Sequence, residues 1–144
     1  MSRASAGRMA DLFKNNRRVF DAGLKKKVTP YDWDKEVAPG ITAVGNIGHT
    51  PGHTSYVLTS GSDKVYLQPD VAIHPDLFVR NPGRHAFFDQ DPKQAETTRR
   101  AVYDMVVTKK LMVHGFHCPF PGLGRVEKDG TGYRLIPAPW NPVI

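Results

Sequence analysis

Three side chains that can ligate a metal ion each follow a predicted strand. His49 follows the strand expected over residues 41–47, Asp70 the strand over 64–68, and His117 the strand over 111–113. Loops at the end of a rigid sheet are a common place for metal ligands, because the sheet holds the ends of the loop in place. Imidazole suits zinc, and a carboxylate can contact two cations. The three residues are therefore candidate metal ligands, although a lone histidine is more often structural.

The elements that would carry these residues alternate between helical and strand patterns. Apolar spacing predicts an amphipathic helix over residues 9–22 that ends near Gly23, and Asp91-Pro92 supplies an N-cap and first turn for another helix. Further short strands are expected at 54–59, 125–127 and 133–136; the first forms a hairpin with 64–68, and the last two form a second hairpin. The order of elements predicts an α/β fold with layered α+β packing. Residues 69–90 show no period and carry three prolines, which indicates a long ordered or functional loop.

Length and composition fit one folded domain. The 144 residues are 40% hydrophobic and 24% charged, and no run of about 18 apolar residues is present to span a membrane. The single cysteine, Cys118, excludes an internal disulfide and a multi-cysteine zinc site. Phe78, Phe87 and Phe88 are expected to close the core rather than to line a pocket.

The net charge of +6 lies entirely in residues 1–27, which hold eight bases and two acids. A basic arm of this kind can bind phosphates or anionic lipid, it can be a transit peptide, or it can be the solvated face of a helix. We favour the solvated helix face, because no RNA motif and no interleaved aromatic residues accompany the charge. The segment contains no apolar core of a secretory signal, so we expect a cytoplasmic protein.

The string Gly48-His49-Thr50-Pro51-Gly52-His53-Thr54 resembles the third metal-binding motif of the metallo-β-lactamase fold hydrolases. In that family a strand delivers the first histidine of the string to a metal, and the second histidine supports it from the outer shell. The resemblance therefore implies that His49 is a ligand and that His53 is its support.

Two later strings continue the resemblance in the same order. Val65-Tyr66-Leu67-Gln68-Pro69-Asp70 matches the strand and bridging aspartate, and Leu111-Met112-Val113-His114-Gly115-Phe116-His117 matches the final strand and histidine. The remaining C-terminal sequence is similar to the branch that includes methyl parathion hydrolase and lactonase-like enzymes. The resemblance implies that 41–144 are the C-terminal half of a metallo-β-lactamase αββα sandwich, preceded by a basic helix and linker over 1–40.

The sequence also departs from the family. The first motif, His-x-His-x-Asp-His, which supplies four of the family's seven usual ligands, does not occur in the 144 residues. We therefore expect a truncated chain. Pro69 replaces the glycine that usually precedes the bridging aspartate, and its fixed φ can alter how Asp70 approaches a metal.

The resemblance implies a metal-dependent hydrolase that uses a metal-bound hydroxide to cleave an ester, lactone or phosphoester. Its cofactor would be zinc or another divalent metal, two ions in the intact family, and its partner a small-molecule substrate. Whether this chain is an enzyme stays open, because the first motif is absent. One alternative is a non-catalytic half-fold remnant or interaction module, whose uncovered sheet face favours self-association or a complementing N-terminal half. The other is a basic nucleic-acid-binding domain, which the charge pattern does not favour.

Overall fold

The computed structural model describes residues 3–140 and 142. The chain divides into two compact units, Met1–Tyr31 and Asp32–Ile144, and each is described by itself. The sequence places a boundary at residue 40 instead, so the polar connection before it is shared between the units. No helix among the described residues is long and apolar enough to cross a membrane.

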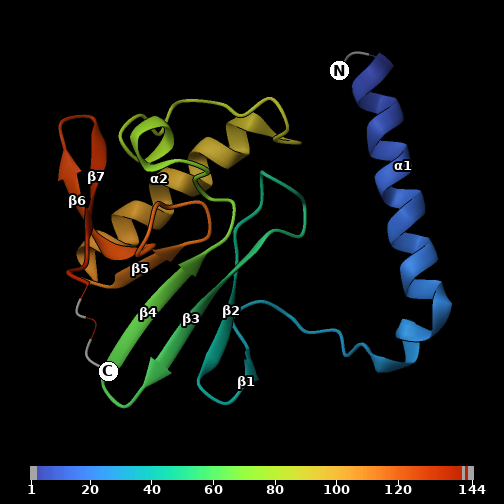
Figure 1. Ribbon diagram of the computed structural model, residues 1–144, viewed down its shortest axis with the longest axis horizontal. Coiled ribbons are helices and arrows are strands. Elements are labelled where there is room, and N and C mark those ends of the chain that lie inside the picture. The colour runs from blue at the N-terminus through green and yellow to red at the C-terminus, as the bar shows by residue number, and fades with distance from the viewer. Residues whose placement is uncertain (1–2, 141, 143–144) are drawn as a thin grey trace. The chain divides into compact units, whose positions relative to one another are not determined.

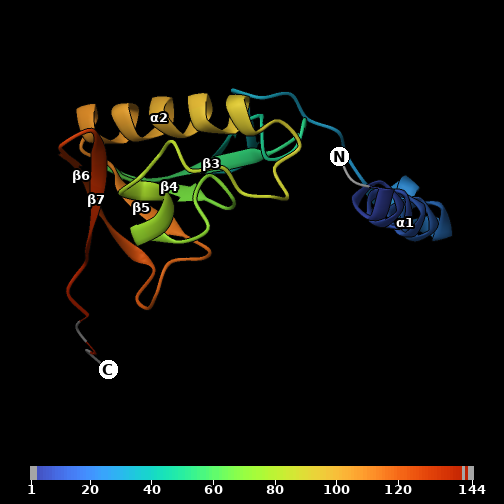
Figure 2. The same cartoon turned by 90° about the horizontal axis from the view of Figure 1, so that it is seen from above.

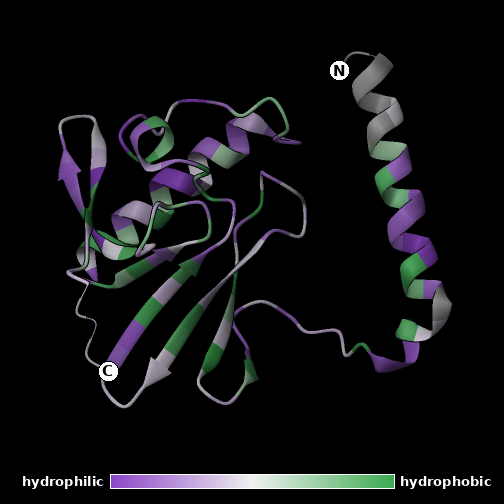
Figure 3. Cartoon of the chain, in the orientation of Figure 1, coloured by the Kyte–Doolittle hydropathy of each residue, from purple (hydrophilic) through white to green (hydrophobic). Residues whose placement is uncertain are grey.

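The first unit is helical. Helix α1 spans Arg3–Val19, a π-helical turn spans Phe20–Leu24, and a 3₁₀ turn spans Lys25–Lys27. The helix begins before its predicted start at residue 9. The segment before residue 9 contains residues that tolerate a helix, but it has no apolar periodicity from which a helix could be predicted. The α-helix ends at Val19, before the predicted end near Gly23; Gly23, with a φ of +101°, lies within the π-helical turn. Bands of hydrophobic and hydrophilic residues alternate along α1 (Figure 3).

The second unit is built on one mixed sheet (Figure 1). Over the described residues it has seven strands in sequence order: β1 (Glu36–Ala38), β2 (Ile41–Gly45), β3 (Thr54–Ser60), β4 (Asp63–Gln68), β5 (Met112–Gly115), β6 (Leu123–Asp129) and β7 (Gly132–Pro137). The neighbours pair antiparallel except β4 and β5, which are parallel. The two predicted hairpins, β3–β4 and β6–β7, are confirmed, and β1 was not predicted because it is only three residues long.

The crossover between β4 and β5 contains helix α2, Pro92–Thr108. The predicted start is confirmed, since the Asp91 side chain accepts a hydrogen bond from the Gln94 backbone N–H at 3.0 Å. Buried residues recur along the helix at the spacing of one face: Ala95, Arg99, Val102, Tyr103 and Val106. This face lies against the sheet, so α2 covers one side of it (Figure 2).

The two faces of the sheet differ in burial. Tyr66 and Val113, which are paired across β4 and β5, are at most 1% exposed and pack with α2 in the core. Side chains alternate between faces along a strand, so a second set points away from α2. This set is half-buried or exposed and is called the distal face: Ile41, Leu58, Val65, Leu67, Met112 and Ile136.

The predicted long loop over 69–90 is ordered by a buried arginine. It contains a short π-helical turn, η3 (Pro75–Val79), whose Val79 joins the core. From α2, Arg99 donates hydrogen bonds to the backbone carbonyls of Val71, Pro82 and Arg84 at 2.7–2.8 Å.

Phe78 packs against the core, as expected. Phe87 and Phe88 do not: they are 87% and 43% exposed, and their rings contact each other edge to face. The prediction that they close the core is therefore wrong. Ala86 and Asp89, on either side of these two residues, are buried, so the backbone directs the two rings outward.

Candidate metal centre

The ends of β2, β4 and β5 bring the three candidate ligands to one place. Asp70 stands at the centre: its Oδ1 lies 2.9 Å from His117 Nε2, and its Oδ2 lies 3.9 Å from His49 Nε2. Each carboxylate oxygen therefore faces a different histidine. Pro69 does not turn Asp70 away from the two imidazoles, which answers the question that this residue raised in the sequence.

His53 holds the backbone of Asp70. Its Nδ1 lies 2.9 Å from the Asn46 carbonyl oxygen, and its Nε2 accepts the Asp70 backbone N–H at 3.0 Å. A carbonyl can only accept, so the ring carries its proton on Nδ1. Burial lowers the pKa of His53 below its ordinary value. The neutral ring matches both hydrogen bonds.

His49 is held from its other side by Asp89, a residue that the sequence did not indicate. Asp89 Oδ1 lies 2.9 Å from His49 Nδ1, and the Asp89 side chain is only 2% exposed. The Phe88 ring contacts the His49 ring edge to face, with centroids 5.7 Å apart. No periodicity or motif marks Asp89, because it acts on a residue forty positions earlier in the chain.

The loop that carries His49 is tied to the start of α2. Gln90 N–H donates to the His49 carbonyl, Asp91 N–H donates to the Gly48 carbonyl, and the Thr98 hydroxyl donates to the Ile47 carbonyl. Gly48 is required here: its φ is +131°, and a Cβ would lie 2.3 Å from the Ala95 backbone nitrogen. The close packing of this loop against α2 therefore fixes the position of His49 relative to the sheet.

The side chains present are of the types that bind a divalent metal, but there are fewer of them than a complete site needs. Nitrogen and oxygen ligands of a tetrahedral zinc lie about 3.4 Å apart, so His49 Nε2 and Asp70 Oδ2, at 3.9 Å, would have to approach each other by about half an ångström to bind the same cation. His117 hydrogen-bonds Asp70 directly and must release that contact to become a ligand. Among the described residues, no group of three His, Cys, Asp or Glu side chains is already arranged to hold a metal ion.

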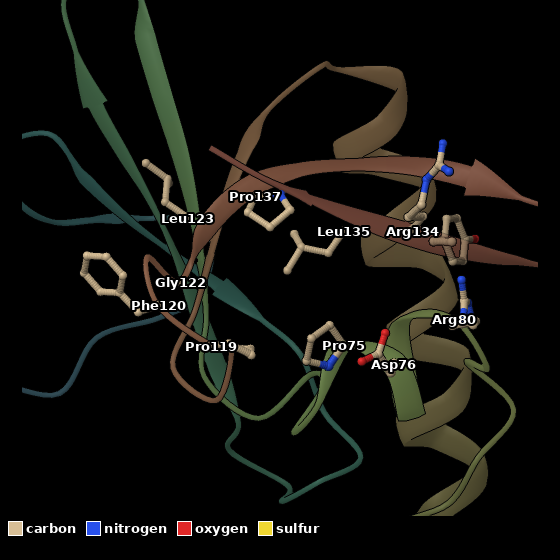
Figure 4. Close-up of a pocket in the computed structure, with 11 residues that line it drawn as sticks. Pro75, Asp76, Arg80, Pro119, Phe120, Gly122, Leu123, Arg134, Leu135 and Pro137 are labelled. Atoms are coloured by element: carbon tan, nitrogen blue, oxygen red, sulfur yellow. The ribbon is translucent and has the colours of Figure 1, made fainter. Parts of the chain in front are cut away.

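The space beside the cluster is small. A cavity of about 10 Å³ borders His49, His53 and Asp70, roughly enough for one water molecule. A larger pocket of about 220 Å³ lies between η3, β7 and the loop that follows His117 (Figure 4). Pro119 and Phe120 line it together with Arg80 and Arg134, whereas none of the candidate ligands does.

Comparison with solved structures identifies the fold of the chain. No protein-family model and no curated protein matches the sequence. Among solved structures, the dizinc quorum-quenching lactonase AidC is 24% identical with a TM-score of 0.78, over 82% of this chain and 40% of its own. The hydrolase AbOPH of the β-lactamase superfamily is 20% identical with a TM-score of 0.85, over 98% and 49%. A probable metal-dependent hydrolase from Staphylococcus aureus is 20% identical with a TM-score of 0.65, over 82% and 43%.

The chain has the metallo-β-lactamase fold. The expected fold class, a layered α+β sheet structure, is thereby confirmed. The chain spans less than half the length of each of these metallo-β-lactamase fold structures. The roles of His49, Asp70, His117 and His53 within that fold stay predictions, now with a geometry that can be tested.

Proposed function

We propose that the Asp70 cluster, which comprises His49, His53, Asp70 and His117, is part of the metal centre of a hydrolase that cleaves an ester, lactone or phosphoester. The observation that carries the proposal is the position of Asp70, whose two oxygens face His49 and His117 separately. This is the arrangement of a carboxylate shared between two cations. The similarity to a dizinc lactonase and to two further hydrolases supports the same chemistry.

Each residue of the cluster then has a distinct task. His49 and Asp70 hold one cation, Asp70 and His117 hold the other, and His53 orients Asp70 through its backbone N–H. Bound divalent metal would lower the pKa of a coordinated water and polarise the scissile bond. The His117 side chain is 46% exposed, so a substrate can approach from its side of the cluster.

Two protein ligands for each cation can bind zinc but do not complete a catalytic site, since catalytic zinc normally has three. The 144 residues contain no His-x-His-x-Asp-His motif. We propose that the remaining ligands come from polypeptide outside these 144 residues, which form one part of a longer catalytic domain. The length of the similar structures, each more than twice the matched part, supports this view.

Zinc retention tests the proposal. The purified chain is loaded with zinc, desalted and analysed for zinc per chain, beside the variants His49→Ala and His117→Ala. We expect the wild type to retain zinc and each variant to lose most of it, because each removes one of three donors. His85→Ala is the matched control, since His85 is a histidine that pairs with Glu96 away from the cluster. Wild-type retention below about a tenth of an equivalent, or equal loss in the control, would contradict the proposal.

The distal face favours a second candidate function, that of an interaction module. Its apolar side chains include Leu58 and Ile136, which are 36% and 38% exposed. Exposed apolar surface on a sheet is a site for association with another chain. A complementing polypeptide that covers this face would serve both candidate functions.

A further inference from the structure

Asp89 is a buried carboxylate with both oxygens engaged. Its Oδ1 lies 2.9 Å from His49 Nδ1, and its Oδ2 accepts the Ala86 backbone N–H at 3.1 Å. An ionised carboxylate only accepts hydrogen bonds, so the His49 ring must supply the proton at Nδ1. The other ring nitrogen, Nε2, then carries a lone pair and faces Asp70.

Arg99 lies beside this carboxylate and carries the opposite charge. Its guanidinium lies 4.0 Å from Asp89 Oδ2, and both side chains are 2% exposed. The same guanidinium binds the carbonyl of Val71, the residue after Asp70. One buried arginine therefore anchors the segment that carries Asp89 and the segment that carries Asp70, so their relative position is set by α2.

We propose that Asp89, held by Arg99, is a positioning residue that fixes neutral His49 as the Nδ1–H tautomer and keeps Nε2 free to bind a cation. The use of that nitrogen for a metal rests on the function proposed above, whereas the tautomer does not. Imidazole with a proton on Nε2 cannot ligate through that atom. Partners of this kind orient metal-binding histidines and raise their affinity for the ion.

An asparagine at position 89 would place a hydrogen-bond donor, in place of an acceptor, next to His49 Nδ1. Asp89 accepts from two donors, the Ala86 N–H and the His49 ring, but an asparagine has only one oxygen. With that oxygen on the Ala86 N–H, the amide NH₂ faces His49 Nδ1. The ring satisfies this donor only by moving its proton to Nε2. Asp89→Asn is therefore expected to switch the tautomer while it preserves the shape of the side chain.

The test is the assignment of the imidazole nitrogens by long-range ¹H–¹⁵N NMR, at a pH where His49 is neutral. We expect the wild type to show a protonated Nδ1 and a bare Nε2, and Asp89→Asn to show the reverse. Asp91→Asn is the matched control: it makes the same chemical change two residues away, at an exposed N-cap where asparagine serves equally well. It should leave His49 as in the wild type.

Two results would overturn the inference. One is a wild-type His49 with its proton on Nε2, which needs no variant and is decisive even if Asp89→Asn does not fold. The other is a folded Asp89→Asn protein that keeps the Nδ1–H tautomer. Zinc titration forms a separate arm, in which Asp89→Asn should weaken binding about 10–100-fold relative to Asp91→Asn. If the wild type binds no zinc, the proposed function fails, and the tautomer still decides the inference.

Discussion

At the scale of single residues, Asp104 shows how an exposed cluster responds to pH. Tyr133 donates a hydrogen bond to Asp104 Oδ1 at 2.6 Å, and Lys128 forms an ion pair with the same atom. The hydrogen bonds from Lys128 and Tyr133 hold the pKa of the Asp104 carboxyl below its ordinary value of 3.8. The folded state therefore favours the ionised carboxylate, which stabilises the protein at every pH above that ordinary value.

We predict that Asp104→Asn lowers the Tm by about 1–3 °C at pH 7, a small loss because both charged side chains are more than half exposed. The loss should shrink as pH falls through the lowered pKa of folded Asp104, because the carboxyl is then protonated in both states. Thermal unfolding at pH 7, 5 and 3 measures it. Glu127→Gln, in the exposed pair with Arg134, is the control. If the decrease in Tm caused by Asp104→Asn grew toward pH 3, the charge of Asp104 would not be its cause.

The sequence located the candidate ligands but not the residues that support His49. His49, Asp70 and His117 stand in short strings whose order along the chain is specific, so they could be named without a structure. Asp89 and Arg99 stand in no such string. They reach partners forty and twenty-eight positions away, and such contacts leave no trace in local spacing.

At the scale of elements, α2 is joined to the crossover loop through Arg99. We predict that Arg99→Met destabilises the chain by about 3 kcal/mol or more, because three backbone carbonyls, two of them in buried hydrogen bonds, lose their donor. Urea unfolding measures the loss. Arg100→Met is the control, since Arg100 is partly exposed and pairs with Glu96 one turn earlier in α2. A change for Arg99→Met within about 0.5 kcal/mol would mean that the loop does not depend on this residue.

The elements were predicted well where their patterns are regular. The start of α2 follows from the cap at Asp91, and the hairpins follow from glycine turns at Gly61 and Gly130, both with positive φ. The short turn η3 was missed, because its burial comes from tertiary contacts rather than from a repeating pattern. The two phenylalanines at 87 and 88 were misjudged for the same reason: composition alone does not tell which side of a loop faces inward.

At the scale of the whole molecule, the distal face is the surface from which we predict association between chains. We predict that the wild type self-associates at tens of micromolar, roughly the range of weak protein contacts, and that the double variant Leu58→Lys with Ile136→Lys does not. Sedimentation velocity over a concentration series measures this. Leu77→Lys places the same charge on an exposed leucine of η3 and should change nothing. A monomeric wild type, or an equal effect of Leu77→Lys, would contradict the prediction.

The fold class could be predicted because the order of elements and motifs is preserved along the chain. The boundary between the two units could not be predicted as well as the fold class. The structure separates the units after Tyr31, whereas composition suggested residue 40, because Trp33 donates from its indole N–H to Thr54 and so belongs with the sheet. Asp34 and Lys35 also form backbone hydrogen bonds with Ala43, and β1 pairs with β2, so these contacts outweigh the polar composition of the segment.

The parallel pairing of β4 with β5 also sets an order of events. The β2–β3–β4 meander and the β6–β7 hairpin join neighbours in sequence and can close quickly, but β5 reaches β4 only after the crossover and α2 have folded back. His49 and Asp70 precede this crossover and His117 follows it. We therefore expect the three to meet only at the slow, long-range step of folding, and a nascent chain to acquire the cluster last.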